Sequence, residues 1–255
     1  PEFVGMNSDS LLMIDTIVDE MLKNGSAPGC QILAAKNGRI FFHKAYGHHT
    51  PNKKVKVKDT DVYDVASVTK ILASTISLMK LYDQGDLILY EPLKKHLPQL
   101  DTTNKGDLII EDVLAHHSGL PGWIPFYEDT MDEESKPRKR IAEYYKSGSA
   151  NGYSLKLTEN LFIRDDWQDS IYRMIYNCDL RENRNYRYSD LGFYLFRQMI
   201  EKKSGLPFDS YVDQTFYKPM GLKDTAFNPW RTMDLKRIPP SEKDTYFRMQ
   251  DVKGY

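Results

Sequence analysis

Apolar residues recur at helical spacing in several stretches of the chain. Between Ser10 and Asn24 they stand three or four positions apart, which predicts an amphipathic helix ending at Asn24-Gly25. The same kind of spacing predicts further helices at 109–115, 137–147, 166–177, 191–203 and 208–217. Most of the chain after residue 66 is therefore expected to be helical.

Two apolar runs joined by a tight turn predict a β-hairpin near the start. Cys30 to Lys36 and Arg39 to Tyr46 flank Asn37-Gly38, a dipeptide typical of two-residue hairpin turns. A lysine-rich stretch, 47–61, follows and is expected to be a solvated loop. A lone hairpin needs further strands beside it, and no convincing strand follows. We therefore expect the chain to end before its sheet is complete.

The stretch from Val65 to Tyr82 is apolar on nearly every face, which predicts a buried helix. Lys70 is its only charged residue as far as Met79, and Ser67 stands three positions earlier, on the same face. Asp64 is the expected N-cap, which would place Ser67 in the first turn, where the helix terminus favours a developing anion.

Composition excludes several classes of protein. The chain has 255 residues, 35 Lys+Arg and 36 Asp+Glu, so its net charge of −1 argues against nucleic-acid binding through a basic surface. No run approaches the ~18 apolar residues of a membrane span. Its two cysteines, Cys30 and Cys178, exclude a disulfide framework and leave one bridge between them open.

The pair Ser67 and Lys70 is the first candidate for chemistry. A lysine on a buried helix loses its proton more readily, and it can then activate a neighbouring hydroxyl as a nucleophile. The alternative is an ordinary serine beside a lysine whose stem reaches solvent. Tyr188 precedes the helix expected at 191–203, so its phenol could move a proton in the same cleft, or it could simply pack.

The histidine pair His116-His117 invites a metal interpretation. Adjacent residues do not share a helix face, however, and no H-E-x-x-H motif or second ligand cluster occurs. A Ser-His-Asp triad is open on composition, but the G-x-S-x-G motif is absent. The basic run 136–140 has acidic neighbours, so we interpret it as a solvated face. No metal or other cofactor is expected.

Several motifs together resemble a family. Ser67-Val68-Thr69-Lys70, preceded by Tyr63-Asp64-Val65-Ala66, is similar to the nucleophile motif of serine β-lactamases and penicillin-binding proteins, closest to the class C group with its esterases and D-peptidases. Tyr188-Ser189-Asp190 stands where that group has Tyr-x-Asn. Other segments of similar kind follow in the right order: Pro1–Met6, Ala27–Gly29, Gly85–Leu87, Leu114–Leu120 and Pro219–Thr225.

The resemblance implies an α+β, β-lactamase/transpeptidase-like fold, with an all-α region and an incomplete α/β region. We expect one domain over 1–255: an N-terminal helix and hairpin (1–66), a mostly helical part (67–230) and an irregular end (231–255). Ser67 would form an acyl-enzyme, Lys70 and Tyr188 would move protons, and Asp190 would support the site. The implied substrate is a peptidoglycan stem peptide, a β-lactam or a small ester, outside the cytoplasm.

Two departures from the family pattern matter. Asp190 replaces an asparagine, and an ionised carboxylate only accepts hydrogen bonds, so Asp190 is expected to pair with Lys70 and hold it protonated. The family's third motif, on a late strand, has no counterpart before Tyr255. These departures favour a rival prediction: a non-catalytic accessory module of a larger protein, such as a glycoside hydrolase. This chain alone is expected to be inactive and to self-associate through its unfinished sheet.

Overall fold

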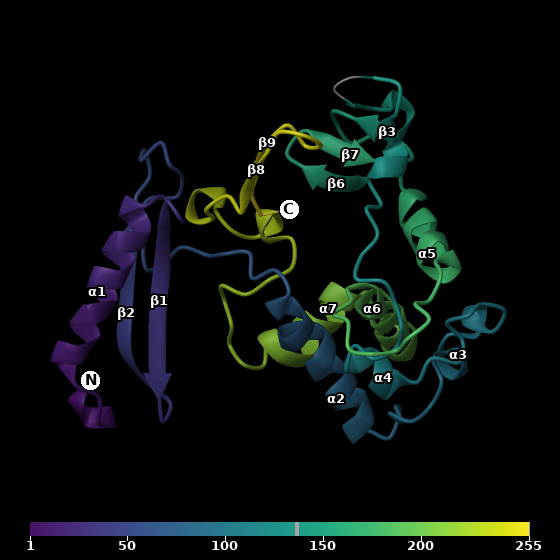
Figure 1. Ribbon diagram of the computed structural model, residues 1–255, viewed down its shortest axis with the longest axis horizontal. Helices are drawn as coiled ribbons and strands as arrows, with labels where there is room; N and C mark the ends of the chain where they lie inside the picture. The colour runs from purple at the N-terminus through teal and green to yellow at the C-terminus, as the bar shows by residue number, and fades with distance from the viewer. Residues whose placement is uncertain (136–137, 255) are drawn as a thin grey trace. The chain divides into compact units, whose positions relative to one another are not determined.

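The computed structural model describes residues 1–135 and 138–254, which fold into two compact units (Figure 1). The first unit comprises Pro1–Asp64, Asn228–Thr245 and 249–254. The second comprises Val65–Phe227 together with Tyr246–Arg248. The assignment of 1–255 to one domain, divided near 66/67 and 230/231, stays a prediction.

Helix α1 (Ser8–Lys23) opens the first unit after a 3₁₀ turn, η1 (Glu2–Val4). Its N-cap is Asn7, whose side chain accepts a hydrogen bond from Ser10 N–H at 2.9 Å and so satisfies one of the free amides of the first turn. Val18 is buried on the inner face. The predicted N-terminal helix is confirmed, with a start two residues earlier.

Strands β1 (Gly29–Lys36) and β2 (Arg39–Gly47) form the predicted antiparallel hairpin. Asn37 and Gly38 both take positive φ, 52° and 72°, as a two-residue turn of this kind requires. Helix α1 lies along the hairpin in Figure 1, where Tyr46 Oη donates to its Asp15 carboxylate at 2.6 Å. The hairpin is therefore held by a helix of its own unit.

The stretch 47–61 is anchored more firmly than a solvated loop. The carboxylate of Asp61 is buried, accepts a hydrogen bond from Lys58 N–H at 2.7 Å and lies 2.6 Å from His49 Nε2. Since both partners of the His49–Asp61 pair are buried, the pair fixes the path of the chain between the hairpin and the second unit. The polar composition of this stretch concealed that contact.

The last part of the first unit was expected to be irregular, and this is wrong in one respect. Two 3₁₀ turns, η7 (Pro229–Arg231) and η8 (Leu235–Arg237), are followed by strands β8 (Glu242–Asp244) and β9 (Gln250–Val252), which pair antiparallel. Strands of three mostly polar residues give no apolar alternation that a sequence pattern could reveal. Tyr255 lies outside the described residues.

The second unit is mainly helical, as predicted. Its helical elements are η2 (Lys70–Thr75), α2 (Ile76–Asp83), α3 (Leu93–His96), η3 (Pro98–Leu100), α4 (Ile110–Leu114), η4 (Glu128–Thr130), η5 (Ala142–Tyr144), α5 (Trp167–Asn177), α6 (Leu191–Ser204), α7 (Phe208–Val212) and η6 (Asp213–Tyr217). Helix α6 lies at the centre and buries Leu191, Leu195, Phe196, Met199 and Ile200 completely. These side chains join one hydrophobic cluster with residues of α2, α4, α5 and α7.

Small sheets interrupt the helices between residues 131 and 163. Strands β3 (Met131–Asp132) and β4 (Lys139–Arg140) form one, and β5 (Tyr145–Lys146), β7 (Leu161–Ile163) and β6 (Leu155–Thr158) form the other. Of the helix predicted over 137–147, the described residues contain only the 3₁₀ turn η5 (Ala142–Tyr144), and the flanking residues form strands β4 and β5, so most of that prediction is wrong. Pro137 lies outside the described residues. Tyr145, Leu161 and Ile163 are buried and belong to a second hydrophobic cluster in this region.

The expected continuous, fully buried helix over 65–82 is also wrong. Ala66 has a positive φ of 43°, which breaks the helix before Ser67, and a six-residue π-helical segment, η2, precedes α2. Thr69, and not Asp64, occupies the N-cap position of η2. Ala73, Ser77, Leu78 and Leu81 are buried. The opposite side exposes apolar residues: Val68, Ile71, Leu72, Met79 and Tyr82.

A close approach at Gly192 offers a test of this packing. A Cβ at Gly192 would overlap the Val113 side chain of α4, so Gly192→Ala is expected to lower the free energy of unfolding by about 1–3 kcal/mol. The double variant Gly192→Ala/Val113→Ala should lose about 1 kcal/mol less than the sum of the losses in the two single variants, because the smaller side chain at position 113 removes the overlap. Urea unfolding of the wild type, the two single variants and the double variant measures this coupling. Gly148→Ala, in open space, is the control; strictly additive losses at 113 and 192 would contradict the packing.

Candidate active site

Ser67 lies at the start of the nucleophile helix, in a turn with an unusual backbone. The preceding residue, Ala66, takes the left-handed conformation that residues with a side chain rarely adopt. The next amides then close four-residue turns: Lys70 N–H donates to the Ser67 carbonyl at 3.0 Å, and Thr69 N–H to that of Ala66 at 3.0 Å. The strained turn holds the Ser67 side chain exposed, immediately before the helical segment.

Lys70 joins the predicted site residues. Its Nζ donates hydrogen bonds to Ser67 Oγ at 2.9 Å and to Asp190 Oδ1 at 2.6 Å, and it lies over the Tyr188 ring. An ammonium has three donors, and these two oxygens use two of them. The expected contacts Ser67–Lys70 and Lys70–Asp190 are therefore confirmed as contacts.

Helix α6 brings Tyr188 and Asp190 to Lys70. Both residues precede the first turn of α6, and Asp190 N–H donates to the Gly122 carbonyl at 2.8 Å, which fixes the segment. Lys70 Nζ lies 4.8 Å from the centroid of the Tyr188 ring and 5.5 Å from that of Phe193. The ammonium thus sits among two aromatic rings and one carboxylate.

The charge state of Lys70 follows from these contacts. Burial pushes the pKa of Lys70 down, but the hydrogen bond and charge of Asp190, with Tyr188 beside the ammonium, outweigh burial, so its pKa is raised. The Lys70 side chain is 15% exposed and that of Asp190 is 43% exposed. Lys70 is therefore an ammonium at neutral pH, and it donates to Ser67 Oγ instead of accepting the serine proton.

The two histidines of the 114–120 turn take separate positions. The His116 ring lies 4.6 Å from the Tyr188 ring, whereas His117 Nδ1 lies 3.2 Å from the Arg184 carbonyl. His49, in the first unit, pairs with Asp61. Among residues 1–135 and 138–254, no three His, Cys, Asp or Glu side chains are grouped so that they could hold a metal ion. Sequence reasoning considered His116 as a possible metal ligand and as part of the family-like segment Leu114–Leu120, and missed its contact with Tyr188.

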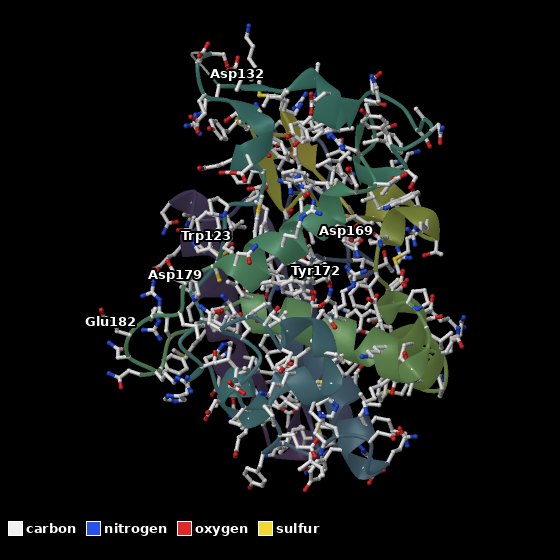
Figure 2. The ribbon with its side chains drawn as sticks, turned by 90° about the vertical axis from the view of Figure 1, so that its right-hand side faces the viewer. Trp123, Asp132, Asp169, Tyr172, Asp179 and Glu182 are labelled. Atoms are coloured by element: carbon white, nitrogen blue, oxygen red, sulfur yellow. The ribbon has the colours of Figure 1, made fainter. Side chains whose placement is uncertain are left out.

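The cleft expected at Ser67 remains a prediction. One open hollow of about 430 Å³ lies elsewhere in the second unit and is lined by none of the site residues; its lining is Asp129, Tyr144, Trp167, Ser170, Arg173, Met174 and Asn177. Figure 2 shows Asp179 and Glu182 on the segment that follows α5, and Trp123 on the same side of the second unit.

Comparison with known proteins identifies the class. The β-lactamase family model matches residues 14–238, and the chain belongs to that family. The chain is 32% identical over 231 residues to the N-acetylmuramyl-L-alanine amidase of Bacillus subtilis (strain 168), a match covering 83% of this chain and 46% of that protein. It is 27% identical over 227 residues to protein flp of Staphylococcus aureus (strain MRSA252), covering 87% of this chain and 39% of flp.

Solved structures agree on the fold. EstCE1, a hydrolase with promiscuous acyltransferase activity, matches with a TM-score of 0.63 at 21% identity, over 94% of this chain and 57% of that chain. The D-alanine carboxypeptidase AmpC of Burkholderia cenocepacia matches with a TM-score of 0.59 at 17% identity, over 87% and 51%. The fold is thus β-lactamase/transpeptidase-like, with helices and small sheets. The chain spans less than half the length of the two curated relatives named above.

Proposed function

We propose that the protein is a serine hydrolase that works through an acyl-enzyme on Ser67. The observation that carries the proposal is the contact of one ammonium, Lys70, with Ser67 Oγ, Asp190 and Tyr188. A nucleophile within reach of a proton-transfer group that is itself oriented by a third residue is the arrangement nucleophilic catalysis needs. Membership of the β-lactamase family supports the same reaction.

In the proposed reaction, Ser67 is the nucleophile, and Lys70 and Tyr188 transfer protons. Ser67 Oγ forms a bond to the carbonyl carbon of a peptide, β-lactam or ester, and the bond from that carbon to the leaving group breaks. The serine proton passes through Lys70 or Tyr188 to the leaving group, and a water molecule then releases the acyl group. Because Lys70 is held as an ammonium, transfer must wait until Lys70 loses its proton or until Tyr188, as a phenolate, accepts one.

The name of the Bacillus relative supports a peptidoglycan-like substrate, which we include in the proposal. A location outside the cytoplasm, which the family resemblance implies, is part of the proposal as well. Among the described residues, the structure contains no helix long and apolar enough to cross a membrane. A non-catalytic accessory module is the second candidate. It is favoured by the 2.6 Å contact between Lys70 and Asp190, which opposes the deprotonation of Lys70.

Two covalent probes separate these functions in the full-length protein. We expect a fluorophosphonate to label Ser67, identified by peptide mass spectrometry, and a fluorescent penicillin to label it weakly. The reason is Asp190: an ionised carboxylate offers no donor to the acylamide carbonyl of a penicillin, whereas asparagine would. Heat-denatured protein is the control. Strong labelling by both probes would contradict the expected selectivity, and labelling by neither would favour the accessory module.

A further inference from the structure

His116 holds the segment that carries Tyr188 at three points. Its carbonyl accepts a hydrogen bond from Arg187 N–H at 2.9 Å, and its Nδ1 accepts one from Ser189 N–H at 3.1 Å. Between these two bonds, the Tyr188 ring lies 4.6 Å from the imidazole, tilted by 36°. The residues on either side of Tyr188, and Tyr188 itself, are thus all in contact with His116.

The backbone of His116 makes this arrangement possible. His116 has a positive φ of 60°, the left-handed conformation, and ends the short turn after α4. That conformation directs its carbonyl and its imidazole to the same neighbouring segment. A side-chain-bearing residue keeps such a conformation only where its surroundings over-determine it, and the two hydrogen bonds and the ring contact do so here.

The contact with Ser189 requires one form of the ring. In neutral imidazole, a nitrogen without a proton accepts a hydrogen bond, but in the protonated ring both nitrogens are donors. Protonation of His116 would therefore place the Nδ1–H of the ring against the N–H of Ser189, with no acceptor between them. It would also add a positive charge near Lys70, which already carries one.

We propose that neutral His116 is a positioning residue that holds Tyr188 against Lys70, and that its protonation releases Tyr188 and slows acyl transfer in mild acid. This inference rests on the proposed function. The ring's closest titratable and charged neighbours are Lys70, Tyr186, Tyr188, Asp190, His117 and, through its backbone, Arg187.

The electrostatics agree with a neutral ring at neutral pH. Burial lowers the pKa of His116, and the charge of Lys70 and the neighbouring His117 lower it further, against the opposing effect of Asp190. The ring therefore stays neutral above its ordinary value of 6.5 and begins to protonate only below it. Because the folded form binds this proton less readily than the unfolded chain, lowering the pH through this range also weakens folding.

Two matched substitutions in the full-length protein separate the parts of this role. In His116→Asn, Oδ1 stands where Nδ1 stood and can accept from Ser189 N–H; the amide does not titrate, and asparagine tolerates the left-handed conformation. His116→Phe keeps an aromatic ring beside Tyr188 but has no acceptor. His117→Asn is the control, because His117 contacts a different carbonyl, that of Arg184.

The measurement is kcat and KM for ester hydrolysis from pH 4.5 to 8. Wild type and His117→Asn should lose kcat below about pH 6.5, the ordinary histidine pKa. His116→Asn should keep kcat within about threefold at pH 7.5 and lose the additional fall below about pH 6.5, keeping only the dependence on Lys70 that all the variants share. His116→Phe should lose about five- to tenfold in kcat at every pH, with little change in KM, because one positioning hydrogen bond is gone. A wild-type acid limb in His116→Asn would overturn the proposal, as would full kcat in a folded His116→Phe.

A readout independent of turnover keeps the two proposals distinguishable. With serine labelled by ¹⁵N, the Ser189 amide shift should titrate with His116 in wild type and stay constant in His116→Asn. An amide that does not titrate in wild type overturns the positioning role. Absence of turnover and of Ser67 labelling in wild type overturns the proposed hydrolase, and the amide titration then decides the role of His116 by itself. If His116→Phe does not fold, the asparagine variant and the amide titration still decide.

Discussion

Ser67→Ala is expected to abolish fluorophosphonate labelling of the full-length protein and to lower ester hydrolysis by at least about 10³-fold. The substitution removes the oxygen that would form the acyl bond, and the other members of such a group contribute little without it. Ser67 is exposed, and its only hydrogen bond from a described side chain comes from Lys70 at 2.9 Å. The fold should therefore tolerate the change.

Thr69→Ala is the matched control for Ser67→Ala. It removes a neighbouring hydroxyl two residues along the same turn, one that faces no member of the proposed site in the described contacts. We expect hydrolysis within about twofold of wild type, since the half-buried Thr69 side chain makes no capping hydrogen bond at this helix start. Full labelling of Ser67→Ala, or an equal loss in both variants, would contradict the role of Ser67 as nucleophile.

The second large expected effect is an increase in the rate at which Ser67 reacts. Asp190→Asn removes the carboxylate 2.6 Å from Lys70 Nζ, a contact that raises the lysine pKa. Burial, which lowers that pKa, then acts with less opposition. A close opposite charge shifts a pKa by about 1–3 units, and each unit changes the neutral fraction about tenfold at a pH well below the pKa. A less basic lysine is a weaker proton acceptor, which offsets part of the gain.

We therefore expect Asp190→Asn to accelerate fluorophosphonate labelling of Ser67 about tenfold at pH 7.5. The rise of the labelling rate with pH, which follows the deprotonation of Lys70, should begin at a lower pH, because Lys70 loses its proton more readily in this variant. Penicillin labelling should rise as well, since an amide at position 190 can donate to an acylamide carbonyl. Asp107→Asn, which breaks the exposed 2.8 Å contact with Lys94, is the control. An unchanged or slower rate would show that Asp190 does not restrain Lys70.

The first hairpin and the larger helices could be predicted because their signals are local. Asn37-Gly38 supplies two residues that accept positive φ, and α1, α5 and α6 each present a regular apolar face. The strands between 131 and 163 have two to four residues each, too few for an alternating pattern. Their stability comes from contacts such as the buried ring of Tyr145, which no local pattern reports.

The contact between Lys70 and Asp190 could be predicted because family resemblance placed both residues in one site, and opposite charges attract in a partly buried setting. The position of His116 could not. Its role depends on a left-handed backbone at a residue with a side chain and on hydrogen bonds to a segment seventy residues away. Ala66 presents the same difficulty, because alanine gives no sign that it will adopt a positive φ.

The π-helical segment η2 changes the angle between successive side chains around this helix. Each turn from Lys70 to Thr75 takes up an additional residue compared with an α-helix, and the buried residues Ala73, Ser77 and Leu81 follow at intervals of four. A deletion between Lys70 and Thr75 would remove that additional residue and let the segment close as an α-helix, so α2 would keep nearly the same angle relative to Ser67. The same deletion inside α2 would turn everything after it by about 100°. The position of a one-residue gap, before or after Thr75, thus decides whether it changes length alone or angle as well.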